Sequence, residues 1–232
     1  MSDVQNLGLD PMDLTVQALL DKDLNNDESF YITELPDDES KIKSLIKKYE
    51  SVFRRLPEYK KWKETLCNRY PDTLYTCALT KLPYGTVPLE LHHYPITLYG
   101  MTYTVIQKQL SVVGRCNTLT VAWELLRIHF EEKVGIISLC STLHQYAHNT
   151  QCPLPLQFVV GDYQSFIDEY EQYMPDDVKN LVHKNIEYST SRYGDLNEDQ
   201  AVTKWSMEHL DIYTAIIKEN TDELIELLTE AE

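Results

Sequence analysis

Four of the seven histidines in the chain stand at spacings that suit a metal site. His92 and His93 are neighbours in the apolar run LELHHYPITLYG, and His144 and His148 lie four residues apart in STLHQYAHNT. Residues four apart on a helix project from one face, whereas neighbours on a strand point to opposite faces. Imidazole nitrogens bind divalent cations at roughly 2.0 to 2.1 Å, and an imidazole that titrates near neutral pH is a competent general base. The spacing favours a cation surrounded by three or four histidines from a strand end and a helix, and it allows one strand histidine to bind the cation while the other faces a substrate.

The segments around these histidines predict the elements that would position them. TLYTCALT and LELHHYPITLYG are rich in β-forming residues and are separated by the turn-forming KLPYGTVP, which predicts a hairpin whose second arm carries the histidine pair. Helical spacing of apolar residues predicts a helix over 119–132. GIISLC is a short apolar run before a second helix, which Ser141 or Thr142 would cap. A small strand-bearing centre flanked by helices follows, so the expected fold class is α+β.

The flanking sequence is strongly polarised in charge. Residues 41–69 hold ten Lys or Arg and three Glu, whereas residues 161–232 hold 18 acidic residues and five basic ones, in a chain whose net charge is -16. We expect four segments: an acidic, partly irregular arm over 1–38, a basic helical segment over 39–70, a strand-bearing core over 71–160 and an acidic helical region over 161–232. The three tryptophans are expected to anchor their helices in a core: Trp62, Trp123 and Trp205.

The two histidine segments together resemble a known motif. LELHHYPITL followed by GIISLCSTLHQYAH is similar to the HNH nucleases of the His-Me finger (ββα-metal) class. In that family an acidic residue or His followed by His ends one strand, and a second segment runs through an apolar strand, Leu-Cys and His-x-x-x-His. The resemblance covers about residues 74 to 150, and four residues fall at the family's spacing: Leu139, Cys140, His144 and His148. It implies a small HNH-like ββα-metal core within 71–160, flanked by N- and C-terminal helices, with the helix over 119–132 as an insertion.

The resemblance also implies a chemistry. The family hydrolyses nucleic-acid phosphodiesters with the help of one divalent cation, here Mg, Mn or Zn. His93 would be the general base that deprotonates a water, and the cation ligands would be His92, His144 and His148. Gly135 stands where the family has a central Asn that orients the base-bearing loop, which leaves His93 without that partner.

A polyanion would meet the chain at its basic segment, because cationic side chains bind phosphates and release counterions. We expect the substrate, DNA in preference to RNA, to contact six basic residues: Lys47, Lys48, Arg54, Arg55, Lys60 and Lys61. An equally good interpretation is that the basic helix packs beside an acidic one in the same molecule. The acidic C-terminal helices could in turn bind a host or phage protein.

The remaining composition limits the setting in which the protein acts. Five widely spaced cysteines do not form the pattern of a secreted disulfide framework, and no apolar stretch approaches the roughly 20 residues needed to cross a bilayer. We therefore expect a cytoplasmic protein without membrane association. Its size and acidity are similar to those of proteins carried by bacteriophages, which would place it in an infected bacterial cell.

Three functions remain open from the sequence. The first is a metal-dependent endonuclease. The second is a catalytically degenerate HNH-fold protein that acts as a protein-interaction module or as a nucleic-acid mimic. The third is a helical binding module in which the histidine spacing is a coincidence.

Overall fold

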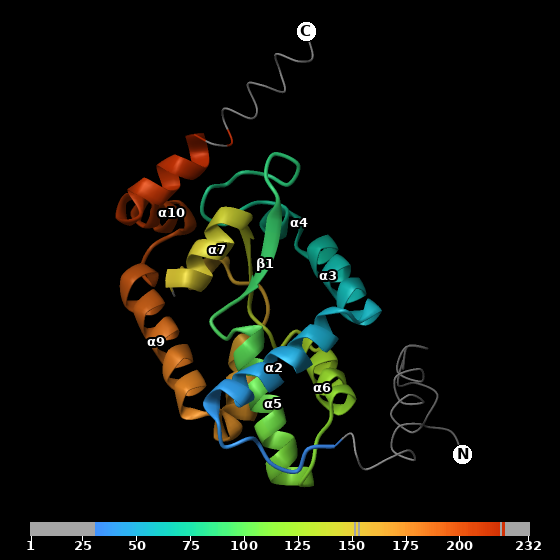
Figure 1. The fold of residues 1–232 in the computed structure, drawn as a ribbon. Coiled ribbons are helices and arrows are strands. Elements are labelled where there is room, and N and C mark those ends of the chain that lie inside the picture. The colour runs from blue at the N-terminus through green and yellow to red at the C-terminus, as the bar shows by residue number, and fades with distance from the viewer. Residues whose placement is uncertain (1–30, 151, 153, 219, 221–232) are drawn as a thin grey trace, which may run out of the picture. The chain divides into compact units, whose positions relative to one another are not determined.

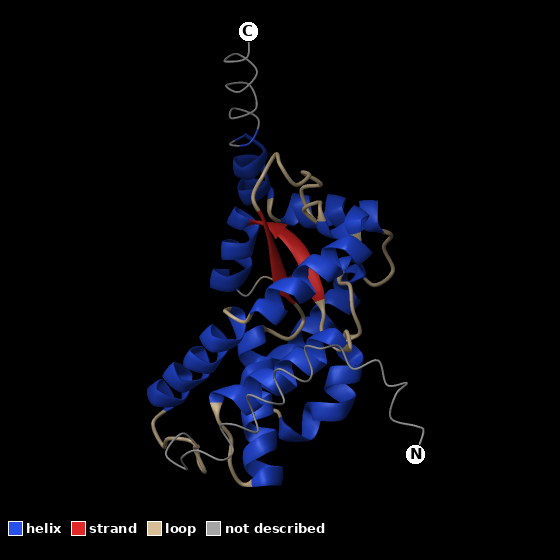
Figure 2. Ribbon diagram, turned by 90° about the vertical axis from the view of Figure 1, so that its right-hand side faces the viewer, coloured by secondary structure: helices blue, strands red, loops and turns tan. Residues whose placement is uncertain are grey.

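The fold is rich in helices and contains one small sheet, as Figures 1 and 2 show. The computed structural model describes residues 31–150, 152, 154–218 and 220, so most of the arm expected over 1–38 lies outside the described residues. The mixture of helices with a two-stranded antiparallel sheet confirms the α+β class. None of the described helices combines the length and the apolar character that crossing a membrane requires.

The chain groups into two compact units, and each unit is assembled from separate stretches. The first unit contains the described residues up to 63, together with 98–131 and 170–175, and the second contains 64–97, 132–169 and the described residues from 176 onward. The elements in chain order are α2 (Glu39–Arg54), α3 (Pro57–Arg69), α4 (Pro71–Leu74), β1 (Leu89–His93), α5 (Leu98–Val113), α6 (Thr118–Phe130), β2 (Ile136–Cys140), α7 (Ser141–Thr150), η2 (Leu156–Phe158), α8 (Tyr163–Tyr170), η3 (Glu171–Tyr173), α9 (Asp176–Tyr193) and α10 (Glu198–Glu208). The helix predicted over 119–132 is confirmed as α6, and the helix predicted to follow GIISLC is confirmed as α7.

Helices α2, α5 and α6 pack on one another in the first unit. Capping side chains fix where two of them begin, because Asp38 caps α2 and Asn117 caps α6 by accepting hydrogen bonds from backbone N–H groups of the first turn. The buried face of α2 carries Ile46, Tyr49 and Phe53 at helical spacing.

An aromatic cluster in the first unit surrounds a buried histidine. The ring of His129, on α6, lies 4.9 Å from that of Phe53, 5.7 Å from Tyr59 and 4.6 Å from Trp62, measured between centroids. His129 is completely buried, and its Nδ1 lies 2.6 Å from the carbonyl oxygen of Leu125. Desolvation lowers the pKa of His129 to about 3, so the ring is neutral and serves the packing of this core.

The three tryptophans differ in burial. Trp62 and Trp205 are 3% and 1% exposed, as expected of core anchors. Trp123 is partly exposed, so the prediction that it anchors a core is wrong. The buried stripe of α6 is formed by Val121, Leu125 and their neighbours one turn further on, and Trp123 falls outside that stripe.

Strands β1 and β2 pair in an antiparallel register that matches Leu89 with Cys140 and His93 with Ile136. Every residue of β2 is buried, whereas β1 is partly exposed over its first three residues. Helix α7 follows β2 directly and contacts both strands. The sheet and this helix therefore form a compact centre of the second unit.

The hairpin predicted between TLYTCALT and the histidine strand is wrong. Residues 75–84 form a separate local turn, since Tyr84 N–H donates to Tyr75 O at 2.7 Å and Cys77 N–H donates to Leu82 O at 2.8 Å. The turn thus falls earlier than the Pro-Gly signals indicated. β1 pairs with the apolar run of β2 instead, and every residue of β2 is buried in that pairing.

We predict that acid destabilises the first unit through His129. The folded ring has a pKa of about 3 against 6.5 as its ordinary value, so its stabilising effect is complete above pH 6.5 and is lost as the pH falls from 6.5 toward 3. This residue alone should reduce the free energy of unfolding by about 2 kcal/mol between pH 7 and pH 5, measured by urea titration.

The variant His129→Phe keeps an aromatic ring in the cluster and removes the titration. Its free energy of unfolding should therefore change less with pH over the same interval, by about 2 kcal/mol. The same pH dependence in both proteins would show that the ring of His129 is not held neutral by burial.

Candidate metal centre

Three imidazoles meet between β1 and α7. The ring centroid of His92 lies 5.1 Å from that of His144 and 4.7 Å from that of His148, and the last two are 4.6 Å apart. One nitrogen of each ring lies within 4.8 Å of those of the other two. The structure therefore brings together the three residues that sequence analysis assigned to the cation, and we call them the histidine cluster.

The sheet register and the helix spacing together produce this cluster. His92 pairs with Ile137, so its side chain points to the face of the sheet on which Ile137 packs in one apolar cluster with Leu143 of α7. His144 and His148 are one turn apart on α7 and project from the same side of the helix. Both rings consequently reach the ring of His92.

The donor set fits one small divalent cation. Nitrogens bound at 2.0 to 2.1 Å in a tetrahedral site lie about 3.4 Å apart. The cluster nitrogens, within 4.8 Å of one another, would close by roughly 1.4 Å at most to reach that separation, which side-chain rotation can supply. Three protein ligands leave a coordination position open, as in catalytic sites. His92 is buried, whereas His148 is exposed, so the cluster can be reached from solvent.

Glu90 adds a carboxylate that sequence analysis missed. Its Oε2 lies 3.1 Å from Nδ1 of His144. A proton on Nδ1 that is donated to Glu90 leaves Nε2 of the same ring available to a cation, and such carboxylate partners orient ligand imidazoles. Glu90 is two residues before His92 and therefore on the same face of β1. This Glu-x-His spacing is the sequence signal that could have identified it.

His93 ends β1 and points to the opposite face from His92. It pairs with Ile136 and is only 4% exposed. The structure thus places His93 next to the histidine cluster along the chain but on the other side of the strand, as neighbouring strand positions require.

Backbone atoms hold the chain directly after His93. Tyr94 N–H donates to Gly135 O at 2.9 Å. A Cβ atom at position 135 would overlap the carbonyl oxygen of Tyr94, so no side chain fits there, including the Asn of the family pattern. Gly135 therefore has a steric cause, and its main chain fixes the segment that carries His93.

Helix α9 anchors the same segment from another side. The hydroxyl of Tyr94 lies 2.9 Å from Ser189 Oγ and accepts a hydrogen bond from Leu154 N–H at 3.1 Å. Asn185 Nδ2 donates to Pro95 O at 3.1 Å. Burial raises the pKa of Tyr94 to about 12, so this hydroxyl stays protonated at neutral pH.

A small cavity lies beside the histidine cluster. Its volume is about 120 Å³, and its lining residues include His92, His148, Tyr94 and Asn185. A cavity of this size has room for several water molecules, and its lining combines polar and apolar groups. Water can therefore reach two members of the cluster from within the second unit.

The six basic residues assigned to the substrate are all exposed: Lys47, Lys48, Arg54, Arg55, Lys60 and Lys61. They belong to the first unit, whereas the histidine cluster belongs to the second. Arg54 donates to Glu50 through Nε at 3.1 Å and Nη2 at 2.8 Å, which partly neutralises its charge. The lysines present an exposed basic surface on α2 and at the start of α3.

The other histidines have different surroundings. His129 lies in the aromatic core, His209 stacks on Trp205 with centroids 4.4 Å apart, and His183 is exposed on α9. Within the described part of the chain, no second group of three His, Cys, Asp or Glu side chains brings its ligand atoms this close together.

Comparison with known proteins adds an independent finding. A family model described as bacteriophage G278-like virion protein matches residues 11–216. Searches of curated proteins and of solved structures gave no match. The family match supports the phage origin expected from the sequence, while the resemblance to HNH nucleases stays a prediction. Because the match spans most of its length, the chain belongs to the family of bacteriophage G278-like virion proteins.

Proposed function

We propose that this protein is a metal-dependent endonuclease whose β1, β2 and α7 form a ββα-metal core. The observation that carries the proposal is the convergence of His92, His144 and His148, with Glu90 behind one of the rings. These residues come from two segments far apart in the sequence, and their meeting argues against a coincidental histidine spacing. The third hypothesis, a plain helical binding module, gives no reason for it.

Each residue has one task in the proposed reaction. The histidine cluster would hold a divalent cation, which when bound would supply Lewis-acid stabilisation of the charge on the phosphate and on the departing 3′-oxygen. His93 accepts a proton from a water molecule, whose oxygen attacks phosphorus while the bond to the 3′-oxygen breaks. The products are a 5′-phosphate and a 3′-hydroxyl, and the latter takes its proton from solvent. Glu90 orients the ring of His144.

The end of β1 is the place where the cation ligands and the general base could act on one phosphodiester. His93 is the last residue of the strand, and the chain then turns at Tyr94, which Gly135 and α9 hold in place. A phosphodiester lying across this strand end would face the histidine cluster on one side and His93 on the other. Because His93 is 4% exposed, the proposal requires that substrate binding opens access to its ring.

The nucleic-acid backbone would be contacted by the exposed lysines and arginines of α2 and the start of α3. Such contacts fix the position of a substrate and carry no base sequence information. The family description speaks of a virion protein, and we propose that this chain travels with a phage particle and meets nucleic acid in the bacterial cell.

The burial of His93 favours a second candidate function. In this alternative the cation links β1 to α7 as a structural cross-link, and the protein acts as an interaction module or a nucleic-acid mimic. His93 is only 4% exposed and the chain around Gly135 is tightly packed, so substrate would not reach the base in this alternative.

We predict that the protein binds one divalent cation per chain through the histidine cluster. Elemental analysis after dialysis against Zn²⁺ or Mn²⁺ should find one equivalent in the unmodified protein and none in His144→Ala. Glu90→Gln should weaken binding by about 10- to 100-fold in calorimetric titration, because it removes the carboxylate that orients His144. Binding should weaken as the pH falls, because the ligands bind in their neutral form.

His183→Ala is the matched control, since it removes an exposed histidine on α9 that lies outside the cluster. It should bind the cation as the unmodified protein does. Equal binding by His144→Ala and His183→Ala would exclude the proposed centre.

We predict cleavage of plasmid DNA in Mg²⁺ or Mn²⁺, with a rate at least about 100-fold lower in His93→Ala because the general base is lost. The variant should keep its cation, since His93 lies on the other side of the strand from the cluster. The measurement is the rate of supercoiled plasmid loss at equal cation occupancy.

The outcome separates the two candidates. A bound cation with no cleavage in the unmodified protein would select the interaction module. Cleavage that survives in His93→Ala would remove His93 from the mechanism.

A further inference from the structure

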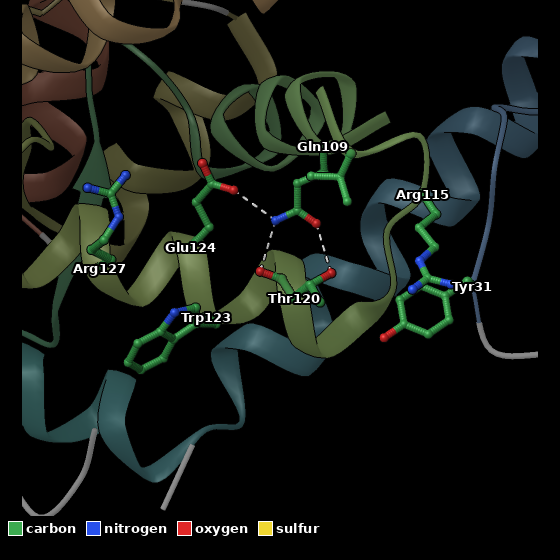
Figure 3. A pocket seen from close by; sticks show the side chains of 8 residues that line it. Tyr31, Gln109, Arg115, Thr120, Trp123, Glu124 and Arg127 are labelled. Carbon is green, nitrogen blue, oxygen red and sulfur yellow. Dashed lines mark hydrogen bonds between the residues drawn. The ribbon is translucent and has the colours of Figure 1, made fainter. Parts of the chain in front are cut away.

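The first unit has a pocket of its own between the end of α5 and the start of α6 (Figure 3). Its volume is about 380 Å³, within the range of about 300 to 1,000 Å³ typical of ligand sites. Tyr31, Arg115, Trp123 and Arg127 are among the lining residues, and the accessible lining is mostly apolar. We call it the α5–α6 pocket.

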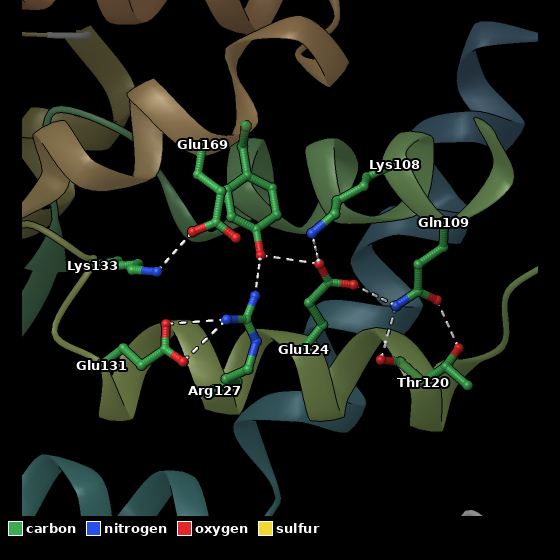
Figure 4. A network of polar contacts seen from close by, with 9 residues as sticks. Lys108, Gln109, Thr120, Glu124, Arg127, Glu131, Lys133 and Glu169 are labelled. Atoms are coloured by element: carbon green, nitrogen blue, oxygen red, sulfur yellow. Dashed lines mark hydrogen bonds and ion pairs between the residues drawn. The ribbon is translucent and has the colours of Figure 1, made fainter. Parts of the chain in front are cut away.

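Gln109, Thr120 and Glu124 line this pocket and belong to a hydrogen-bonded network (Figure 4), and we call these three residues the floor of the pocket. Gln109 Nε2 donates to Thr120 O at 3.0 Å and to Glu124 Oε2 at 2.8 Å, while Thr120 Oγ1 donates to Gln109 Oε1 at 2.8 Å. Glu124 Oε1 also accepts from Lys108 Nζ at 2.7 Å and from the Tyr170 hydroxyl at 3.0 Å. Three side chains donate hydrogen bonds to Glu124 and hold it in place, and Lys108 neutralises its carboxylate, so the floor does not repel an anion.

The walls of the pocket offer a flat aromatic surface and a cation. Trp123 is partly exposed on α6, and its indole borders the pocket. Arg115 lies over the ring of Tyr31, 4.7 Å from the centroid, and among the described residues no carboxylate pairs with it. Arg127 is already engaged, since it donates to both carboxylate oxygens of Glu131 at 3.0 and 3.1 Å. The guanidinium that remains available to a ligand is therefore that of Arg115.

We propose that the α5–α6 pocket binds an unpaired nucleotide of a single strand, with the base against Trp123 and its phosphate on Arg115. A flat indole in a mostly apolar pocket suits a base, and a guanidinium that pairs with no carboxylate of the described residues suits a phosphate. The same unit carries the exposed basic residues of α2, which can follow the adjoining backbone. This deepens the proposed function by naming an unpaired strand as its ligand, and it rests on nucleic-acid binding but not on the histidine cluster.

The first test is binding of an oligothymidylate of about ten nucleotides, in EDTA so that no cation-dependent cleavage takes part. The ligand should quench tryptophan fluorescence through Trp123, because Trp62 and Trp205 are 3% and 1% exposed. In fluorescence anisotropy with a labelled oligomer, Trp123→Ala should bind about fivefold more weakly or worse, and Trp123→Phe should lose less. Phe130→Ala removes a 41% exposed ring from the same helix outside the pocket and should bind normally.

The second test is the salt dependence of that binding. Arg115→Gln should reduce the slope of log K against log salt by about 0.7, the value for one phosphate contact on a single strand. Lys184→Gln makes the same charge change at an exposed position of α9 and should leave the slope unchanged.

Three results would overturn the assignment. They are normal binding by folded Trp123→Ala, equal binding of a duplex of the same length, and quenching by thymidine monophosphate at concentrations at which the oligomer gives none. The last result would identify a free nucleotide as the occupant. Loss of nuclease activity in the plasmid assay would leave these measurements unaffected, so the two proposals fail separately.

Discussion

The register in which β1 pairs with β2 decides where each candidate functional side chain of the second unit points. Pairing of His92 with Ile137 directs His92 and Glu90 toward α7 and sends His93 to the other face. A shift of one residue would exchange the two histidines, so that His93 would meet α7 and His92 would not. Such a shift would also change the packing against β2, all of whose residues are buried. The apolar core therefore favours the observed register and, with it, the observed positions of the polar side chains.

The local part of the candidate site could be predicted from the sequence, and the partner of its strand could not. The four-residue spacing of His144 and His148 fixes a common helix face wherever α7 lies, so that half of the cluster needed no tertiary information. Strong turn residues stand next to β1 and favour a local hairpin, whereas its actual partner β2 follows only after α5 and α6. Pairing over such a distance is decided by total buried apolar surface, which local propensity does not report.

Glu90 and Gly135 show two other limits of sequence analysis. The role of Glu90 can be inferred only once β1 is known to face α7, because a single Glu on a strand predicts no particular partner. In the family pattern an Asn that positions the base-bearing loop stands where this chain has Gly135, so the pattern alone indicates that a positioning side chain is missing. In the structure the carbonyl of Tyr94 excludes any side chain there, and the Gly135 carbonyl accepts the hydrogen bond that holds the chain after His93. A main-chain contact thus positions this segment, and such a contact leaves no side-chain motif in the sequence.

The acidity of the chain opposes a nucleic-acid ligand only weakly at physiological salt, because the range of electrostatic interactions in salt is short. At physiological ionic strength the screening length is about 8 Å, so a phosphate responds mainly to the charges beside it and only weakly to a net charge of -16. Exposed lysines on α2 and an Arg115 without a carboxylate partner among the described residues create locally positive surfaces in the first unit. The net charge would slow the approach of a polyanion at low salt, whereas the strength of contact depends on these few cations.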